Sequence, residues 1–152
     1  MKPEVLAGLL KRSYEKIDLE KFEDRLKIQK YIYILQNRGI PLGFYFNFYL
    51  YGPYSTDLTR TSYQIQNYEK MKRVKFKDAS YEEKFKDILN VINTHSNDTK
   101  WLECASSILF LKEMGYEKKT IFERIKKKIT TFEDEYVDQV WNELNEIGWI
   151  NE

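Results

Sequence analysis

The sequence predicts a mainly α-helical protein: a single-domain bundle of six to seven helices over residues 1–152, with a short aromatic strand or extended segment near 44–51. Apolar residues recur at spacings of three and four along most of the chain, which is the period of amphipathic helices. Only one aromatic run departs from that period. No repeat, low-complexity tract or Gly/Ser/Pro-rich linker interrupts the chain, and 152 residues is the size of one ordinary domain.

Two helices are expected before residue 40. Pro3 suits the first turn of a helix, because its missing N–H is not needed there. The apolar stripe of this helix is formed by Val5, Leu6, Leu9, Leu10 and Tyr14. Asp18 is the expected cap of a second helix over about 19–38. Gly39 followed by Pro41 is a common helix stop, so the second helix should end there.

The main candidate for β-structure is the segment 44–51, which reads FYFNFYLY. Aromatic residues favour strands, and Gly43 and the pair Gly52-Pro53 bound the run. Because strict alternation of apolar and polar residues is absent, a helix is the alternative. If the segment is a strand, Gly52-Pro53 is expected to make the turn that follows it.

Two more helices are expected in the middle of the chain. Ser55 or Thr56 can cap a helix that reaches about residue 71. Ser80 and Glu83 have the spacing of a capping box, in which each side chain satisfies a backbone N–H at the start of a helix. The apolar residues that follow in helical period are Phe85, Ile88, Leu89 and Ile92.

The next helix, opened by Asn97 or Asp98, is apolar around most of its circumference. A helix of this kind is expected in the middle of a domain. Gly115 should end it. Its Cys104 is then expected to be a small buried hydrophobic residue rather than a reactive thiol.

Two helices and an extended tip are expected to close the chain. The helices cover about 117–129 and 132–147, the second with Thr131 as its cap. The tip, Gly148-Trp149-Ile150, is apolar. Three closing helices with an extended end outline a winged-helix or helix-turn-helix unit, so we predict a winged-helix-like C-terminal part. A plain helical bundle is the alternative.

No recognisable catalytic or metal-binding constellation is present in the sequence. The single histidine, His95, stands where a helix should end and is expected to support the last carbonyls there. One His and one Cys do not make the usual zinc site, and no phosphate loop or dinucleotide fingerprint occurs. The sequence therefore predicts a protein that is not an enzyme and has no cofactor.

The winged-helix outline raises the question of nucleic-acid binding. The segment 132–147 would be the recognition helix, but it carries six carboxylates and no Lys or Arg, so a phosphate backbone would repel it. Basic residues gather at 70–77 and 118–128 instead, and a nucleic-acid-binding alternative would use Lys72, Arg73, Lys75, Lys119, Arg124 and Lys127. Otherwise these clusters are solvated, or they pair with the acidic helix of the same or a second chain.

Charge and cysteine content predict the compartment. The 25 basic and 24 acidic side chains nearly cancel, so the net charge of +1 gives no overall attraction to nucleic acid or to an anionic membrane. A single cysteine forms no intramolecular disulfide, which fits a reducing environment. The N-terminal segment lacks the features of a signal peptide, and no run approaches the ~18 apolar residues of a membrane span. A cytoplasmic protein without membrane contact is expected.

Two motifs carry a family resemblance. Residues 26–33 read LKIQKYIY, and residues 48–55 read FYLYGPYS. This pair resembles the YwgA-like proteins and the related Panacea (SocA-like antitoxin) domain, in which an LQKLLYLLQ-like helix precedes an aromatic segment with a YGP ending. The Tyr54-Ser55 step is similar to the YwgA-like form. The later segments WLECASSILFLKE and VWNELNEIGWI also look like that family, so the resemblance spans most of residues 20–150.

The resemblance implies a mostly helical cytosolic protein of prokaryotic or phage type. Panacea domains bind and neutralise toxins, and some relatives are linked to regulated proteolysis or transcription. We therefore expect an antitoxin-like, non-enzymatic regulatory module whose partner is a toxin or another regulator, or a second copy in a homodimer. A winged-helix-type transcriptional regulator is the alternative. Carried over from the motifs, with Gln29 beside them, the partner-binding candidates are Lys27, Lys30, Tyr33, Tyr51, Gly52, Pro53, Tyr54 and Ser55.

The paired motifs also predict local packing. Phe46 and Phe48 or their neighbours should pack on the LKIQKYIYILQ helix, while Tyr51 and Tyr54 should face a partner. The 12 tyrosines support an interface, because a tyrosine packs its ring and still offers a hydroxyl group. A purely structural role of the motif residues is the alternative.

Overall fold

The structure is a computed structural model that describes residues 1–95 and 98–151. It confirms the predicted fold class, since these residues form seven α-helices and one short antiparallel hairpin. The helices are α1 (Pro3–Leu10), α2 (Phe22–Asn37), α3 (Thr56–Tyr63), α4 (Ala79–Thr94), α5 (Thr99–Glu113), α6 (Lys118–Lys128) and α7 (Asp134–Glu146), and the strands are β1 (Asn47–Tyr49) and β2 (Gly52–Tyr54). No helix in the described ranges combines the length and the apolar character that crossing a bilayer would require.

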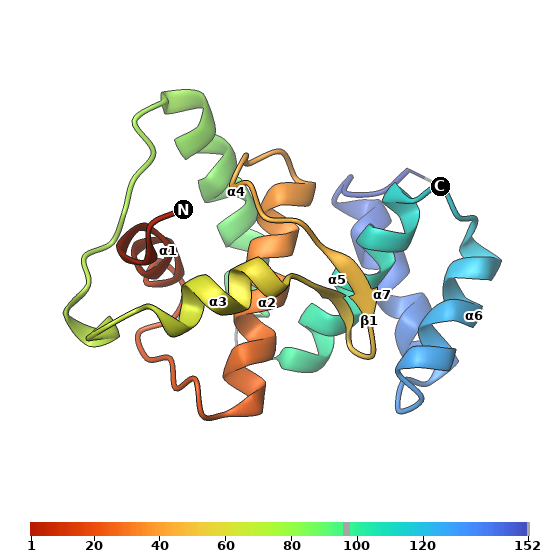
Figure 1. The fold of residues 1–152 in the computed structure, drawn as a ribbon. Coiled ribbons are helices and arrows are strands. Elements are labelled where there is room, and N and C mark those ends of the chain that lie inside the picture. Colours follow the sequence, from red (N-terminus) through yellow and green to blue (C-terminus); the bar gives the residue numbers. More distant parts are fainter. Residues whose placement is uncertain (96–97, 152) are drawn as a thin grey trace.

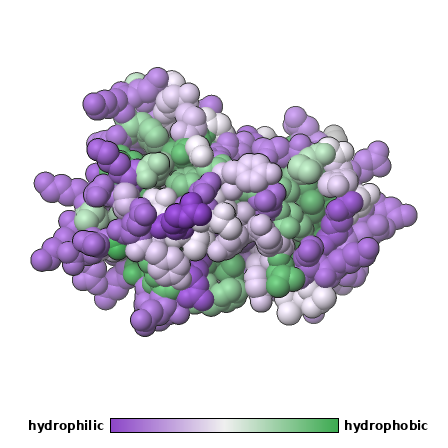
Figure 2. Space-filling model, in the orientation of Figure 1, coloured by the Kyte–Doolittle hydropathy of each residue, from purple (hydrophilic) through white to green (hydrophobic). Residues whose placement is uncertain are grey.

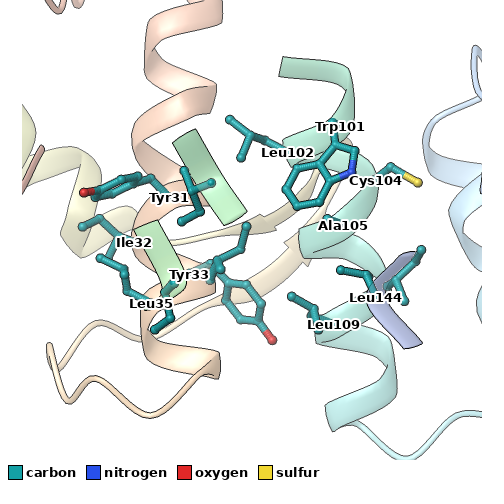
Figure 3. Packing of buried hydrophobic residues seen from close by; sticks show 14 of the residues in the cluster. Tyr31, Ile32, Tyr33, Leu35, Trp101, Leu102, Cys104, Ala105, Leu109 and Leu144 are labelled. Atoms are coloured by element: carbon teal, nitrogen blue, oxygen red, sulfur yellow. The ribbon is translucent and has the colours of Figure 1, made fainter. Parts of the chain in front are cut away.

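Helix α5 lies in the middle of the fold, as its sequence predicts (Figure 1). Helix α2 packs against it, α6 and α7 pack on it toward the C-terminal end of the molecule, and β2 contacts both α2 and α5. In Figure 3, Tyr33 of α2 and Leu102 and Leu109 of α5 lie between these two helices, whereas Tyr31 points to the other side of α2. The buried hydrophobic side chains of α5 are Trp101, Leu102, Cys104, Ala105, Ile108, Leu109 and Leu111. Because core side chains surround α5, this helix fixes the positions of α2, β2, α6 and α7, which pack on it.

Two of the expected helix caps are confirmed. The hydroxyl oxygen of Ser55 accepts a hydrogen bond from the backbone N–H of Leu58 at 3.2 Å and so begins α3. The carboxylate of Asp98 accepts from the N–H of Trp101 at 3.1 Å and begins α5. The alternative cap, Asn97, lies outside the described residues.

Three other expected caps are wrong. Helix α4 is capped by Asp78, whose carboxylate accepts from the N–H of Ser80 at 2.8 Å, so the supposed capping box lies inside the first turn. Asp18 accepts from the N–H of Glu20 at 3.0 Å, in the loop before α2. Helix α7 begins beyond Thr131 and has no side-chain cap. Helix α4 thus still begins after a preferred cap residue, whereas α2 and α7 begin without a side-chain cap.

Helix α3 is shorter than predicted, because it ends at Tyr63 instead of near residue 71. Asn67 adopts a left-handed conformation (φ 53°), and a 3₁₀ turn follows. The chain then runs beside α1, where the N–H of Val74 donates to the carbonyl oxygen of Gly8 at 3.1 Å. A side chain at Gly8 would overlap Val74, so the glycine permits this close approach.

The C-terminal part contains the three expected helices, but its described residues after α7 form bends and no strand. Ile150 is buried. Arg38, at the end of α2, donates to the carbonyl oxygen of Trp149 at 3.0 Å and places its guanidinium group 5.5 Å from the centre of the indole ring. The expected extended tip is therefore folded back onto α2, and this part has three helices without a β-wing.

Candidate functional site

Two glutamines of α2 hold the two ends of the hairpin segment 44–55. The side-chain amide of Gln29 donates to the carbonyl oxygen of Ser55 at 3.1 Å, and its carbonyl accepts from the Ser55 N–H at 2.8 Å. Gln36 makes the same paired contact with Phe44, with both distances 2.8 Å. The two glutamines are seven positions apart and therefore lie on the same face of the helix. Helix α2 thus fixes both ends of the segment.

Lys30, the neighbour of Gln29, holds the hairpin between these ends. Its side chain is 1% exposed, and its Nζ donates to the carbonyl oxygen of Pro53 at 2.6 Å. Burial lowers the pKa of Lys30 to about 7, against a smaller opposite effect of the Glu103 carboxylate. Burial also raises the pKa of Glu103 to about 7. A lysine is seldom buried this completely, and here its hydrogen bond ties β2 to the protein core.

The hairpin turn differs from the predicted one. Leu50 and Tyr51 connect the strands, while Gly52 and Pro53 belong to β2 and pair with Tyr49 and with Phe48 respectively. Gly52 has φ +96°, and a Cβ atom at this position would overlap Ser107 of α5. The Gly-Pro pair therefore lets β2 lie directly on α5, and it does not form the turn.

The aromatic residues of the segment pack partly as predicted. Phe46 is buried against Tyr33 of α2, with ring centres 5.2 Å apart, so its predicted contact is confirmed. Phe48 instead stacks on Phe110 of α5, at 5.6 Å and 26°. Residues two apart in an extended chain point to the same side, so Phe48 lies on the side of Phe46 and reaches Phe110, whose ring centre is 5.7 Å from that of Tyr33.

An apolar groove opens beside the tip of the hairpin. It has a volume of about 330 Å³ and is lined by Phe22, Leu26, Lys30, Tyr49, Leu50, Tyr51, Gly52, Tyr54 and Thr56. Leu50 is 63% exposed, Phe22 is 48% exposed and Tyr51 is 42% exposed. The rings of Phe22 and Tyr51 meet edge to face with centres 5.1 Å apart. Figure 2 shows apolar surface at the tip of the hairpin.

The structure divides the predicted partner-binding residues into three groups. Lys30, Gly52, Pro53 and Ser55 are buried and hold the hairpin in place. Tyr51 and the half-buried Tyr54 border the groove, where the hydroxyl of Tyr54 accepts a hydrogen bond from Thr59 at 2.6 Å. Lys27 and Tyr33 do not line the groove.

Lys27 and Tyr33 are engaged by other parts of α2 and by α5. The ammonium group of Lys27 lies 3.9 Å from the carboxylate of Asp24. The hydroxyl of Tyr33 donates to the carboxylate of Glu113 at 3.2 Å. Tyr51 contacts Phe22 instead of either residue, so Lys27, Tyr33 and Tyr51 do not converge on one reaction centre.

The two basic clusters do not form one surface. The segment carrying Lys72, Arg73 and Lys75 lies beside α1, whereas α6, with Lys119, Arg124 and Lys127, lies at the opposite end of the molecule (Figure 1). Arg73 pairs with Glu15 at 2.6 Å. A nucleic acid would therefore contact one cluster or the other.

His95 and Cys104 have structural surroundings. The His95 ring stacks on Trp101 at 4.0 Å, and its Nε2 lies 2.7 Å from a carboxylate oxygen of Glu143. His95 ends α4 as expected, where its backbone N–H donates to the carbonyl oxygen of Ile92 at 2.8 Å, but its ring links the end of α4 to α5 and α7 instead of contacting the last carbonyls. Cys104 is buried, and burial raises the pKa of its thiol. Among the described residues, no group of His, Cys, Asp and Glu side chains is arranged to hold a metal ion.

Sequence reasoning missed Gln36, Phe22 and Leu50. Gln36 carries a detectable signal, because it stands seven residues after Gln29 in the same helix motif. Phe22 and Leu50 carry none, since apolar residues at a helix start or in an aromatic run are normally assigned to the core. Only their exposure in the folded chain marks them.

Replacing Gln29 with alanine is expected to lower the free energy of unfolding by about 2 kcal/mol, because the buried N–H of Ser55 loses its acceptor. Gln36→Ala should cost about 1 kcal/mol, since Phe44 is only partly buried and water can replace the amide. Urea unfolding measures both changes, and hydrogen exchange of the Ser55 amide should accelerate. Gln66→Ala, at an exposed position, is the control. Equal midpoints for Gln29→Ala and Gln66→Ala would contradict the contact.

Comparison with family models, with curated proteins and with solved structures found no match for this chain.

Proposed function

We propose that this chain is a non-enzymatic regulator that binds another protein through the apolar groove at its hairpin tip. The observation that carries the proposal is a rigidly held hairpin that leaves Leu50 and Tyr51 exposed beside Phe22. The partner is a toxin or another regulatory protein, as the resemblance to the YwgA-like and Panacea families implies. The proposal places the chain in a prokaryotic or phage regulatory system with an antitoxin-like role.

The groove has the chemistry of a protein-binding surface. Its lining is almost entirely apolar and aromatic, and such side chains contribute most of the binding energy at interfaces. Exposing Leu50 to water is unfavourable for the free chain, and a partner that covers it recovers about 25 cal/mol for each Å² of apolar surface. A partner with a matching apolar side chain would therefore bind here.

Rigidity supports the same function. The paired contacts of Gln29 and Gln36 and the hydrogen bond from Lys30 order the segment 44–55 in the free protein. A surface that is already ordered loses little conformational entropy when a partner binds, so more of the contact energy appears as affinity. The amine of Lys30, the group in the groove with a strongly shifted pKa, is occupied by the carbonyl of Pro53. The groove therefore offers contact area more than a reacting group.

The double variant Leu50→Ala/Tyr51→Ala is expected to weaken partner binding by thirtyfold or more, which corresponds to about 2 kcal/mol at an interface hot spot. The native partner would be recovered from the source cells with the tagged wild-type chain, identified, and its affinity measured by isothermal titration calorimetry. Tyr45→Ala is the matched control, because Tyr45 is 70% exposed and does not line the groove.

Both variants should unfold within about 0.5 kcal/mol of the wild type, since all the replaced side chains are exposed. The proposal is wrong if the double variant folds normally and keeps the wild-type affinity for every partner. Sedimentation velocity of the isolated protein tests the homodimer: a dimer that the double variant dissociates would make a second copy the occupant of the groove.

A further inference from the structure

The outer edge of β1 is open to an additional strand. The sheet contains two strands, and β1 pairs with β2 alone among the described residues. Phe48 stands opposite Pro53, which has no N–H and cannot exchange a pair of hydrogen bonds with it. Phe48 therefore occupies a non-hydrogen-bonded site of the antiparallel ladder, and its N–H and C=O point away from β2 toward the outer edge.

A second groove lies between this edge and α6. It has a volume of about 280 Å³ and is lined by Phe48, Thr120, Glu123, Arg124, Lys127 and Lys128. In Figure 1, β1 is the strand of the hairpin nearer to α6. The five lining residues of α6 recur at spacings of three and four, so they form one continuous face of that helix. One wall of the groove is thus a strand with free backbone groups, and the other is a helix face.

The helix face is positively charged. Lys118 and Lys126 turn toward α7, where they lie 3.2 Å from Asp138 and 2.9 Å from Asp134. The groove side keeps Arg124, Lys127 and Lys128, all exposed, with Glu123 as the single carboxylate among the lining residues.

Arg124 is already positioned in this face. Its guanidinium carbon lies 4.1 Å from the centre of the Tyr116 ring, which limits its rotamers. An ordered cation next to an open strand edge can meet a carboxylate at little entropic cost.

We propose that this groove binds an extended acidic segment of the partner protein, which adds to β1 as a third strand and directs its carboxylates toward Arg124, Lys127 and Lys128. This inference rests on the proposed function and specifies the chemistry of the partner. Strand addition uses the free N–H and C=O of Phe48, and the cations select the acidic side chains. At about 3.3 Å per residue, a segment of three to five residues spans the length of β1.

The same features favour a peptide over the other possible occupants. A nucleic acid has no backbone N–H and C=O groups that can pair with a strand edge. The densest acidic run of a second copy, residues 133–138, lies at the start of α7, which is a packed helix and cannot extend into the groove.

The test is an NMR titration of the ¹⁵N-labelled full chain with the blocked heptapeptide Ac-VEVEVEV-NH₂. The amide signals of Phe48 and of residues 120–128 are expected to shift together. The double variant Arg124→Glu/Lys127→Glu should weaken the affinity at least tenfold. Lys72→Glu, which reverses an exposed cation in the other basic cluster, should leave it unchanged.

Three further probes separate the contributions. Ac-VKVKVKV-NH₂ should not bind, because its charge is wrong, and an acidic peptide N-methylated at alternate residues should not bind, because it lacks strand-pairing N–H groups. The Leu50→Ala/Tyr51→Ala variant should bind the acidic peptide like the wild type. If this variant no longer binds the native partner but still binds the acidic peptide, both proposals are supported. The two sites then act separately.

The inference is overturned if the acidic peptide shifts no signal up to 5 mM, or if the lysine peptide or the N-methylated peptide binds equally well. It is also overturned if the oligonucleotide rU₁₀ shifts residues 120–128 and the peptide does not, since the groove would then be a nucleic-acid site. None of these results tests the proposed role of the hairpin-tip groove. That role is tested only by the affinity of the native partner for the Leu50→Ala/Tyr51→Ala variant.

Discussion

The substitution Gly52→Ala is expected to lower the free energy of unfolding by about 3 kcal/mol. Gly52 has φ +96°, and a left-handed conformation costs an L-residue about 1 to 2 kcal/mol. The added Cβ atom would also overlap Ser107 Oγ on α5, and overpacking of this kind costs about 1 to 3 kcal/mol. Urea unfolding followed by circular dichroism measures the loss.

Two variants separate these costs. Gly43→Ala has a similar φ of +87° but no atom within 4 Å of the new Cβ, so it should lose only about 1 kcal/mol. The double variant Gly52→Ala/Ser107→Ala should recover most of the difference, because the remaining Ser107 Cβ lies 3.5 Å away. Ser107 Oγ has no hydrogen-bond partner among the described residues, so its removal breaks none there. If Gly52→Ala were as stable as Gly43→Ala, the close approach of β2 to α5 would be wrong.

Lys30 is expected to make the free energy of unfolding depend strongly on pH, because its amine is buried in the folded protein. Its pKa is about 7 in the folded protein, whereas that of a lysine in water is 10.5. Between these values the unfolded chain binds more protons than the folded chain, so the free energy of unfolding rises with pH in this window. Below pH 7 both states are protonated, and the buried charge then destabilises the fold most.

Raising the pH from 7 to 9.5 is expected to stabilise the wild type by about 3 kcal/mol more than the variant Lys30→Met. Methionine is similar in length and does not titrate, so the variant should lack this rise. Glu103, with its raised pKa, acts below pH 7, where its protonated form favours the fold and stability falls as pH rises. Above pH 7 the rise therefore comes mainly from Lys30, and the end of the Glu103 titration opposes it in both proteins.

Urea unfolding at pH 7.0, 8.25 and 9.5 measures the two curves. Lys27→Met is the matched control, because it removes a lysine from the same helix whose ammonium group lies near Asp24 instead of in the core. It should keep the wild-type rise with pH. Parallel curves for the wild type and Lys30→Met would show that Lys30 is not the titrating group.

The link between the two sequence motifs illustrates how far sequence reasoning reaches at this site. The motifs LKIQKYIY and FYLYGPYS predict one structural unit, and the contacts of Gln29 with Ser55 and of Lys30 with Pro53 confirm it. Which motif residues would meet solvent was not predictable. Lys30 is polar and would be expected outside, yet it is buried, while the apolar Leu50 is exposed.

The turn of the hairpin shows why local rules failed there. Gly-Pro normally marks a turn, so the local pattern predicts a turn at Gly52-Pro53. The side chain of Ser107 lies against β2 at Gly52, where any larger residue would overlap it. The buried Nζ of Lys30 donates to the carbonyl oxygen of Pro53 in the same strand. These contacts join residues far apart in the chain, and they move the turn to Leu50 and Tyr51.

The sequence by itself determined the helical fold class, the central place of α5 and the existence of one short aromatic segment that is not helical. These features follow from the spacing of apolar residues, which acts within a few turns of the chain. Only the tertiary structure decided which residues cap the helices, that Lys30 is buried, and that Phe48 of β1 shares a groove with Arg124, Lys127 and Lys128 of α6. Burial and pairing depend on neighbours from distant segments, so no local pattern could contain them.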